Sequence, residues 1–216
     1  MARDHFRIAI TQQLAPILTA AGFKRTQPKH FMNVSGDLIR HVGFEMSQWG
    51  DRGFYLHLYV NTLLDPLGNL YSCRVGRRLQ VDPQRKIPWE AATESAATEA
   101  VESVVRTLQD GELAWLMSVQ TLRDYVTEFI ARPETTADDF GLALVLAREG
   151  HTNRAWWSAE KLLCAPPDPD DGEWDQERRA RARILQSAIN DQTVSSLLAS
   201  WRAEYIEANK LGELAS

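Results

Sequence analysis

Five polar side chains in the first third of the chain could carry chemistry: His41, Glu45, Tyr55, His57 and Tyr59. Side chains an even number of positions apart project from the same face of a β-strand. His41 and Glu45 therefore share a face of one strand, and Tyr55, His57 and Tyr59 share a face of the next strand. A histidine beside a carboxylate can transfer protons, and imidazoles with a carboxylate can bind a metal ion. The same group could instead form a binding face for a partner, or an ordinary solvated sheet face stabilised by cross-strand pairs.

Two strands, predicted from alternating apolar residues, must position this polar group. They cover residues 38–48 and 54–62, and the glycines of residues 50–53 are typical of the turn between them. If the strands pair through this turn, both apolar sets must face the core. Both polar sets then lie together on the opposite face.

The remaining elements of the first half complete the predicted sheet. Apolar residues spaced by three and four predict a helix over residues 4–21, and Pro16 is expected to kink it or to begin its last turn. A strand over residues 23–34 is expected before the turn at residues 35–37, and a fourth strand is expected over residues 70–81. The pattern indicates an antiparallel sheet with the first helix packed on its apolar face.

From Pro88 onward the apolar spacing becomes helical. The predicted helices are residues 92–108, 113–131, 138–149, 152–165, 173–189 and 191–210. Pro133–Thr136 is the best linker, which divides the chain into an α+β domain over residues 1–132 and a helical C-terminal extension over residues 133–216. The predicted fold class is α+β: an antiparallel β-sheet with packed helices, followed by an all-helical C-terminal region.

The net charge of −5 conceals a division between two halves of the chain. Residues 1–88 hold 12 basic and 6 acidic residues, whereas residues 89–216 hold 12 basic and 23 acidic ones. The halves could attract each other, or the basic half could meet an anionic partner. Five basic residues cluster between Arg74 and Lys86, which makes nucleic acid an alternative partner, but an isoelectric point near 5.6 opposes it.

Two adjacent tryptophans, Trp156 and Trp157, lie in the predicted helix over residues 152–165. Neighbouring side chains on a helix point about 100° apart, so both cannot lie in the centre of a core. Both could be partly buried between helices. Alternatively, one packs inward and the other stays exposed, as tryptophans that anchor protein interfaces often do.

The sequence lacks a specific motif for a catalytic site, a phosphate-binding loop, a cofactor or a metal centre. We expect no cofactor and favour a non-catalytic protein-interaction module whose partner is another protein. The alternative is an enzyme or metal-binding protein that uses His41, Glu45 and His57. Two cysteines 91 positions apart and the absence of a long apolar stretch favour a cytoplasmic protein that does not bind membranes. The sequence leaves the oligomeric state open.

Several N-terminal segments together resemble a known family. The matching residues are Leu14-Ala15-Pro16-Ile17-Leu18, Ala21-Gly22-Phe23-Lys24-Arg25, Phe31, Leu38-Ile39, Val42, Ser47-Gln48-Trp49 and Phe54. Their order resembles the domain-of-unknown-function family DUF4304 over about residues 4–130. The resemblance implies a small α+β domain found in bacteria, with no established activity. Farther along, residues 142–163 are similar to one helical hairpin of a tetratricopeptide-like repeat.

Overall fold

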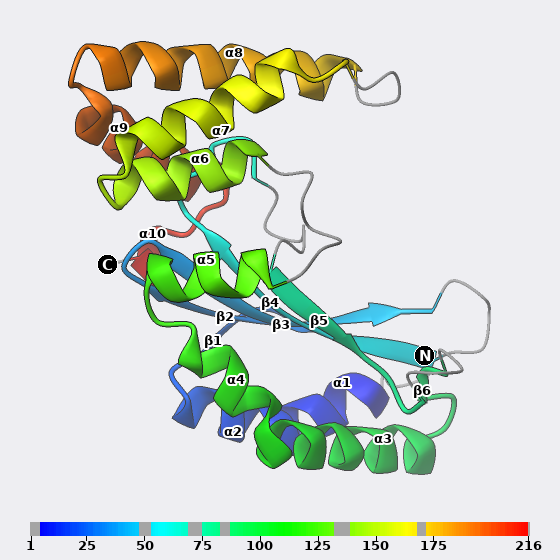
Figure 1. The fold of residues 1–216 in the computed structure, drawn as a ribbon. Helices are drawn as coiled ribbons and strands as arrows, with labels where there is room; N and C mark the ends of the chain where they lie inside the picture. The colour runs from blue at the N-terminus through cyan, green and yellow to red at the C-terminus, as the bar shows by residue number, and fades with distance from the viewer. Residues whose placement is uncertain are drawn as a thin grey trace. The chain divides into compact units, whose positions relative to one another are not determined.

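The computed structural model describes the chain in six stretches, residues 5–47, 53–68, 75–82, 87–131, 139–167 and 172–215 (Figure 1). The chain divides into two compact units. The first unit comprises residues 1–35, 39–61 and 73–120, and the second comprises residues 36–38, 62–72 and 121–216. The linker predicted at Pro133–Thr136 lies outside the described residues.

The first unit is built on an antiparallel sheet, as predicted. Its strands are β1 (Lys24–Gln27), β2 (His30–Ser35), β3 (Leu38–Met46), β4 (Gly53–Thr62), β5 (Val75–Leu79) and β6 (Trp89–Glu90). They lie in the order β1-β2-β3-β4-β5, and β6 pairs with the beginning of β4. The helices that follow to the C-terminus confirm the predicted α+β class.

Two prolines divide elements that the sequence analysis treated as continuous. The first helix consists of α1 (His5–Ala9), a π-helical turn η1 (Ile10–Leu14) and α2 (Ala15–Ala20), with Pro16 in the first turn of α2. Proline has no backbone N–H to donate, and π-turns are a common way for a helix to accommodate an interruption. The single strand predicted over residues 23–34 is wrong, because the chain turns back near Pro28 and β1 pairs with β2.

One face of this sheet is apolar and is covered by helices α1, α2, α3 (Glu94–Thr107) and α4 (Leu113–Ser118), as Figure 1 shows. Its centre is Phe54, which is fully buried and whose ring lies 4.2 Å from that of Phe6, 5.5 Å from Phe44 and 5.7 Å from Trp89. Aromatic rings at these separations pack favourably beyond the area they bury. Between α3 and α4 the turn η2 (Leu108–Glu112) contains Gly111, whose φ of 131° suits glycine.

A buried arginine interrupts the apolar face. Arg40, on β3, donates through Nε and Nη2 to the backbone carbonyl of Val119, at 3.1 and 2.6 Å, and through Nη1 to Asn33 Oδ1 at 2.8 Å. Burial lowers the pKa of Arg40. A buried guanidinium is costly unless its N–H groups find acceptors, and here a carbonyl just beyond α4 and a side-chain amide supply them.

The larger part of the second unit, from residue 121 onward, is helical where the structure describes it. It contains α5 (Leu122–Ile130), α6 (Asp139–Arg148), α7 (Thr152–Cys164), α8 (Gly172–Asn190), α9 (Val194–Ala208) and α10 (Gly212–Ala215). The single helix predicted over residues 113–131 is wrong. Thr121 caps α5 by accepting a hydrogen bond from the backbone N–H of Asp124, while the Asp124 carboxylate accepts one from the backbone N–H of Thr121. This capping box starts a new helix inside the apolar periodicity.

Helices α6 and α7 pack against each other within this unit. The alanines that face the pairing are buried: Ala143, Ala147, Ala155 and Ala159. Small side chains let helix axes approach closely, and Gly150, with φ of 81°, ends α6 and turns the chain back. No helix within the described stretches combines the length and the apolar character needed to cross a membrane.

Candidate functional site

The face of the sheet opposite helices α1–α4 carries the polar side chains. We call it the histidine face, and its members are His30 on β2, His41 and Glu45 on β3, Tyr55, His57 and Tyr59 on β4, and Arg78 on β5. The register of β4 against β5 sets Arg78 directly opposite His57. Residues opposite each other in an antiparallel pair project to the same side, so Arg78 joins the face through strand geometry.

The outer end of the histidine face is partly open to solvent and is held by charge. His57 Nε2 lies 2.7 Å from Glu45 Oε2, and an Arg78 guanidinium nitrogen lies 3.6 Å from the same oxygen. The Arg78 guanidinium also lies over the Tyr55 ring, 3.8 Å from its centroid. Burial is the main cause that lowers the pKa of His57 and Arg78 adds to it, whereas Glu45 acts in the opposite direction. An imidazole aligned by a carboxylate beside a guanidinium can exchange protons with a bound anion.

The inner end of the histidine face is buried and consists of aromatic rings. His30 Nδ1 and His41 Nε2 are 2.9 Å apart, and the two imidazoles stack with centroids 5.0 Å apart. The Tyr59 ring lies 4.4 Å from the His41 ring. His41 is 2% exposed, and burial, followed by the charges of His30 and His57, lowers its pKa to about 3. His41 is therefore neutral at pH 7, and one nitrogen of the histidine pair donates to the other.

Gly43 makes room for the inner end. A Cβ atom at this position would lie 2.4 Å from His41 Cε1 and 2.9 Å from His30 Nδ1, both closer than real contacts allow. The stacked histidine pair therefore requires glycine on β3, two positions beyond His41 and on the same face.

The structure divides the residues that the sequence grouped together. Glu45 lies against His57 at the outer end, whereas the ring of His41 lies against His30 and Tyr59 at the inner end. Among the described residues no group of three or more His, Cys, Asp or Glu could hold a metal ion. The geometry offers an imidazole–carboxylate pair that reaches solvent and a buried histidine pair on another part of the same face.

Sequence reasoning missed two members of the histidine face. His30 was missed because residues 23–34 read as one strand, and the turn signal at Pro28 would have separated β2 and fixed its faces. Arg78 was assigned to a basic cluster, since a spacing of 21 positions from His57 gives no register between β4 and β5.

The histidine face lies within a stretch of the chain that has relatives. Residues 14–118 match the model of the family DUF4304, a domain of unknown function. The expected resemblance is confirmed over these residues. The match takes in every member of the histidine face and ends at the last residue of α4. No curated protein and no solved structure matches the chain.

The predicted basic segment between Arg74 and Lys86 also lies within the DUF4304 match. Arg74, Arg85 and Lys86 fall outside the described residues. Arg77 donates to both carboxylate oxygens of Glu112, at 3.0 and 2.9 Å, and lies over the Trp115 ring at 4.1 Å. Since Arg77 and Arg78 each have an acidic and an aromatic contact in the fold, their charge is partly compensated before any phosphate arrives.

The tryptophan pair lies beyond the DUF4304 match, on α7. Trp156 is half-buried, and its backbone carbonyl accepts a hydrogen bond from Gln186 on α8. Trp157 is 68% exposed, and its ring meets that of Trp156 edge to face, with centroids 5.1 Å apart and an angle of 83° between planes. The helical unit thus presents a large aromatic ring to solvent, backed by a second ring.

Proposed function

We propose that this chain is a non-catalytic protein-interaction module whose helical unit contacts another protein through Trp157. The exposure of this ring is the observation that supports the proposal most directly. Among the described large hydrophobic side chains that are exposed, Trp157 has the highest exposed fraction. Burying an aromatic ring of this size in a partner gives much of the energy of a typical interface hot spot.

The edge-to-face contact with Trp156 supports the same proposal. Because one ring limits the motion of the other, little conformational entropy is lost when a partner covers Trp157.

The charge of the second unit indicates the character of the partner. Its residues include 11 basic and 19 acidic side chains, a net charge of −8. We propose a protein partner with an apolar pocket bordered by lysines or arginines, and we place the interaction in the cytoplasm. Attraction between opposite charges should speed association and weaken as salt screens it.

The proposal is tested by capture with a photo-crosslinking amino acid at Asn153, an exposed position one helical turn before Trp157 on α7, followed by binding measurements with the captured protein. The variant Trp157→Ala should raise the Kd for that protein at least tenfold without lowering the melting temperature. Ile184→Ala, which truncates an apolar side chain that is 46% exposed on α8, is the control and should bind normally. A partner that binds the Trp157→Ala variant as tightly as the unaltered chain contradicts the proposal.

A second candidate function is acid–base catalysis at the outer end of the histidine face. The observation that favours it is the 2.7 Å contact of His57 with Glu45 beside Arg78, with all three side chains reaching solvent. In this reading His57 accepts a proton from substrate and Arg78 stabilises the anion that forms. Turnover of ester or phosphodiester substrates that falls at least 100-fold in His57→Gln and persists in Trp157→Ala would favour this function over the first.

A further inference from the structure

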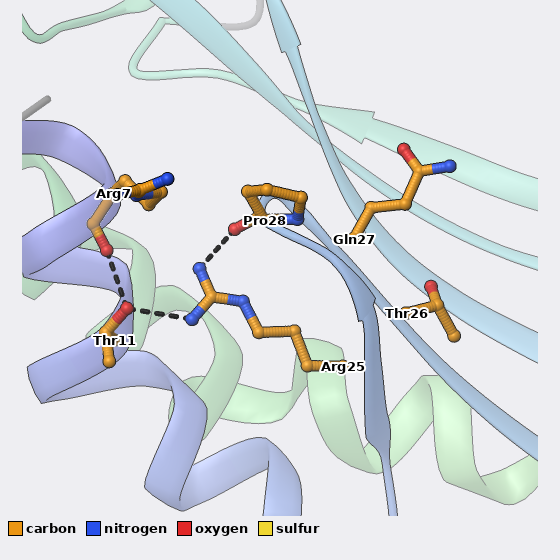
Figure 2. Close-up of a pocket in the computed structure, with 6 residues that line it drawn as sticks. All are labelled: Arg7, Thr11, Arg25, Thr26, Gln27 and Pro28. Carbon is orange, nitrogen blue, oxygen red and sulfur yellow. Dashed lines mark hydrogen bonds between the residues drawn. The ribbon is translucent and has the colours of Figure 1, made fainter.

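A groove on the far side of β1 from the histidine pair is lined by two arginines. It is lined by Arg7 of α1, Thr11 of η1, Arg25, Thr26 and Gln27 of β1, and Pro28 (Figure 2). Its volume is about 380 Å³ and it opens to solvent. That volume falls within the range of small-molecule sites, ~300–1,000 Å³.

Neutral groups hold the Arg25 guanidinium in the groove. It donates through Nη1 to Thr11 Oγ1 at 2.8 Å and through Nη2 to the carbonyl of Pro28, and it lies 5.5 Å from the centroid of the Phe31 ring (Figure 2). Thr11 in turn donates to the backbone carbonyl of Arg7 at 2.8 Å. These contacts fix the direction of the guanidinium while leaving its positive charge uncompensated by a carboxylate among the described residues.

A second cation lies near this guanidinium. Burial and then the nearby charge of Arg7 lower the pKa of Arg25, which means that the two cations repel each other in the chain as it stands. Residues 1–35 contain five basic residues and one acidic residue. An anion bound between Arg7 and Arg25 would offset the repulsion between the two guanidinium groups. This relief of repulsion would contribute to the affinity of the groove for anions.

We propose that the groove between α1 and β1 binds the phosphate group of a small phosphorylated molecule through Arg7 and Arg25. A guanidinium has five N–H groups, so Arg25 retains N–H groups beyond those that donate to Thr11 and Pro28, and charge-assisted hydrogen bonds from two guanidinium groups suit the several oxygens of a phosphate. The open end of the groove leaves space for the organic part of the molecule. This site is separate from Trp157 and from the histidine face, so its success or failure does not depend on the proposed function.

The site is tested by NMR titration of the full chain with inorganic phosphate and with AMP at constant ionic strength. Both probes should shift the backbone amides of Arg7, Thr11 and residues 25–27, and adenosine, which lacks the phosphate, should not. Arg25→Gln and Arg7→Gln should each raise the Kd for AMP at least tenfold. Arg106→Gln, an exposed arginine on α3, is the matched control and should leave the Kd unchanged.

Three results would overturn the assignment. The first is that AMP and adenosine shift the same amides equally. The second is that Arg25→Gln, with an unchanged melting temperature, binds AMP as the unaltered chain does. The third is that the chain binds vesicles containing phosphatidylglycerol but not AMP, which would make a lipid surface the ligand. Since both arginines are exposed, the two variants are expected to fold.

Discussion

The two faces of the sheet are buried in different ways. Toward helices α1–α4, Phe54 and its aromatic neighbours fill the space with apolar rings. On the opposite face His41 and Tyr59 are buried almost as completely, yet their rings carry polar atoms. The first face is stabilised mainly by the hydrophobic effect, with the hydrogen-bonded Arg40 as an exception, whereas the second contains buried imidazoles that must stay neutral.

This difference shows where the molecule should respond to its environment. An apolar face has no group that titrates, so its stability changes little with pH. The histidine face joins a buried, neutral pair to an imidazole–carboxylate contact that reaches solvent, and protons can act on both. Substitutions on the two faces should therefore differ in their dependence on pH as well as in magnitude.

The largest loss of stability should come from removing a buried ring from the apolar face. Phe54→Ala removes a fully buried ring and should lower the free energy of unfolding by about 3–5 kcal/mol, measured by urea denaturation. The loss should be the same at pH 5 and pH 7. Val81→Ala, at an exposed position after β5, should cost less than about 0.5 kcal/mol. A Phe54→Ala loss as small as that of the control would contradict the central place of this ring.

The next largest loss of stability should come from lowering the pH, through His41. Its pKa is lowered from 6.5 to about 3 in the folded chain, so the unfolded chain binds the additional proton between these values and stability falls as the pH drops through that window. From pH 7 to pH 5 the loss attributable to His41 is about 2 kcal/mol. Denaturation at both pH values should show this loss reduced in His41→Gln and retained in His151→Gln, an exposed control.

Crowding the histidine pair should cost somewhat less. Gly43→Ala brings a Cβ atom to 2.4 Å from His41, which must shift its ring, so we expect a loss of about 1–2 kcal/mol in the free energy of unfolding. Gly212→Ala adds a methyl group where no heavy atom lies within 4 Å and should be close to neutral. Equal stability of the two variants would mean that the histidine pair tolerates displacement and does not hold the inner end.

The smallest effect should come from the solvent-exposed end. Glu45→Gln removes the carboxylate that raises the pKa of His57, so an NMR titration should find that pKa lower than in the unaltered chain. The change in the free energy of unfolding should stay below about 1 kcal/mol, because water screens the pair. Glu102→Gln on α3 serves as the control. An unchanged pKa of His57 would show that Glu45 does not act on the imidazole in solution.

The sequence predicted which side chains of β3 and β4 share a face, because the alternation of a strand depends only on neighbouring residues. It did not carry the burial of the polar face, since alternation separates polar from apolar side chains without saying what covers either. The spacing of Thr121 and Asp124 is typical of a capping box and indicates a new helix at α5. The apolar periodicity continues across this position and predicted a single helix instead. Trp156 and Trp157 had to point in different directions, and only helix packing decided that Trp157 points outward.

The contact between Arg40 and Val119 has a consequence for how the first unit is made. The two residues are 79 positions apart, so the chain supplies Asn33 before Arg40 but supplies the Val119 carbonyl, the acceptor of Nε and Nη2, long after β3. During synthesis the guanidinium must stay hydrated until α4 has formed and the carbonyl beyond it is in place. The interior of the sheet is therefore complete only when the last residues of this unit are in place. Contacts between residues far apart in the sequence form slowly, because a long loop must close first. A nascent chain that stops short of Val119 would keep a hydrated cation where the finished unit has a dry one.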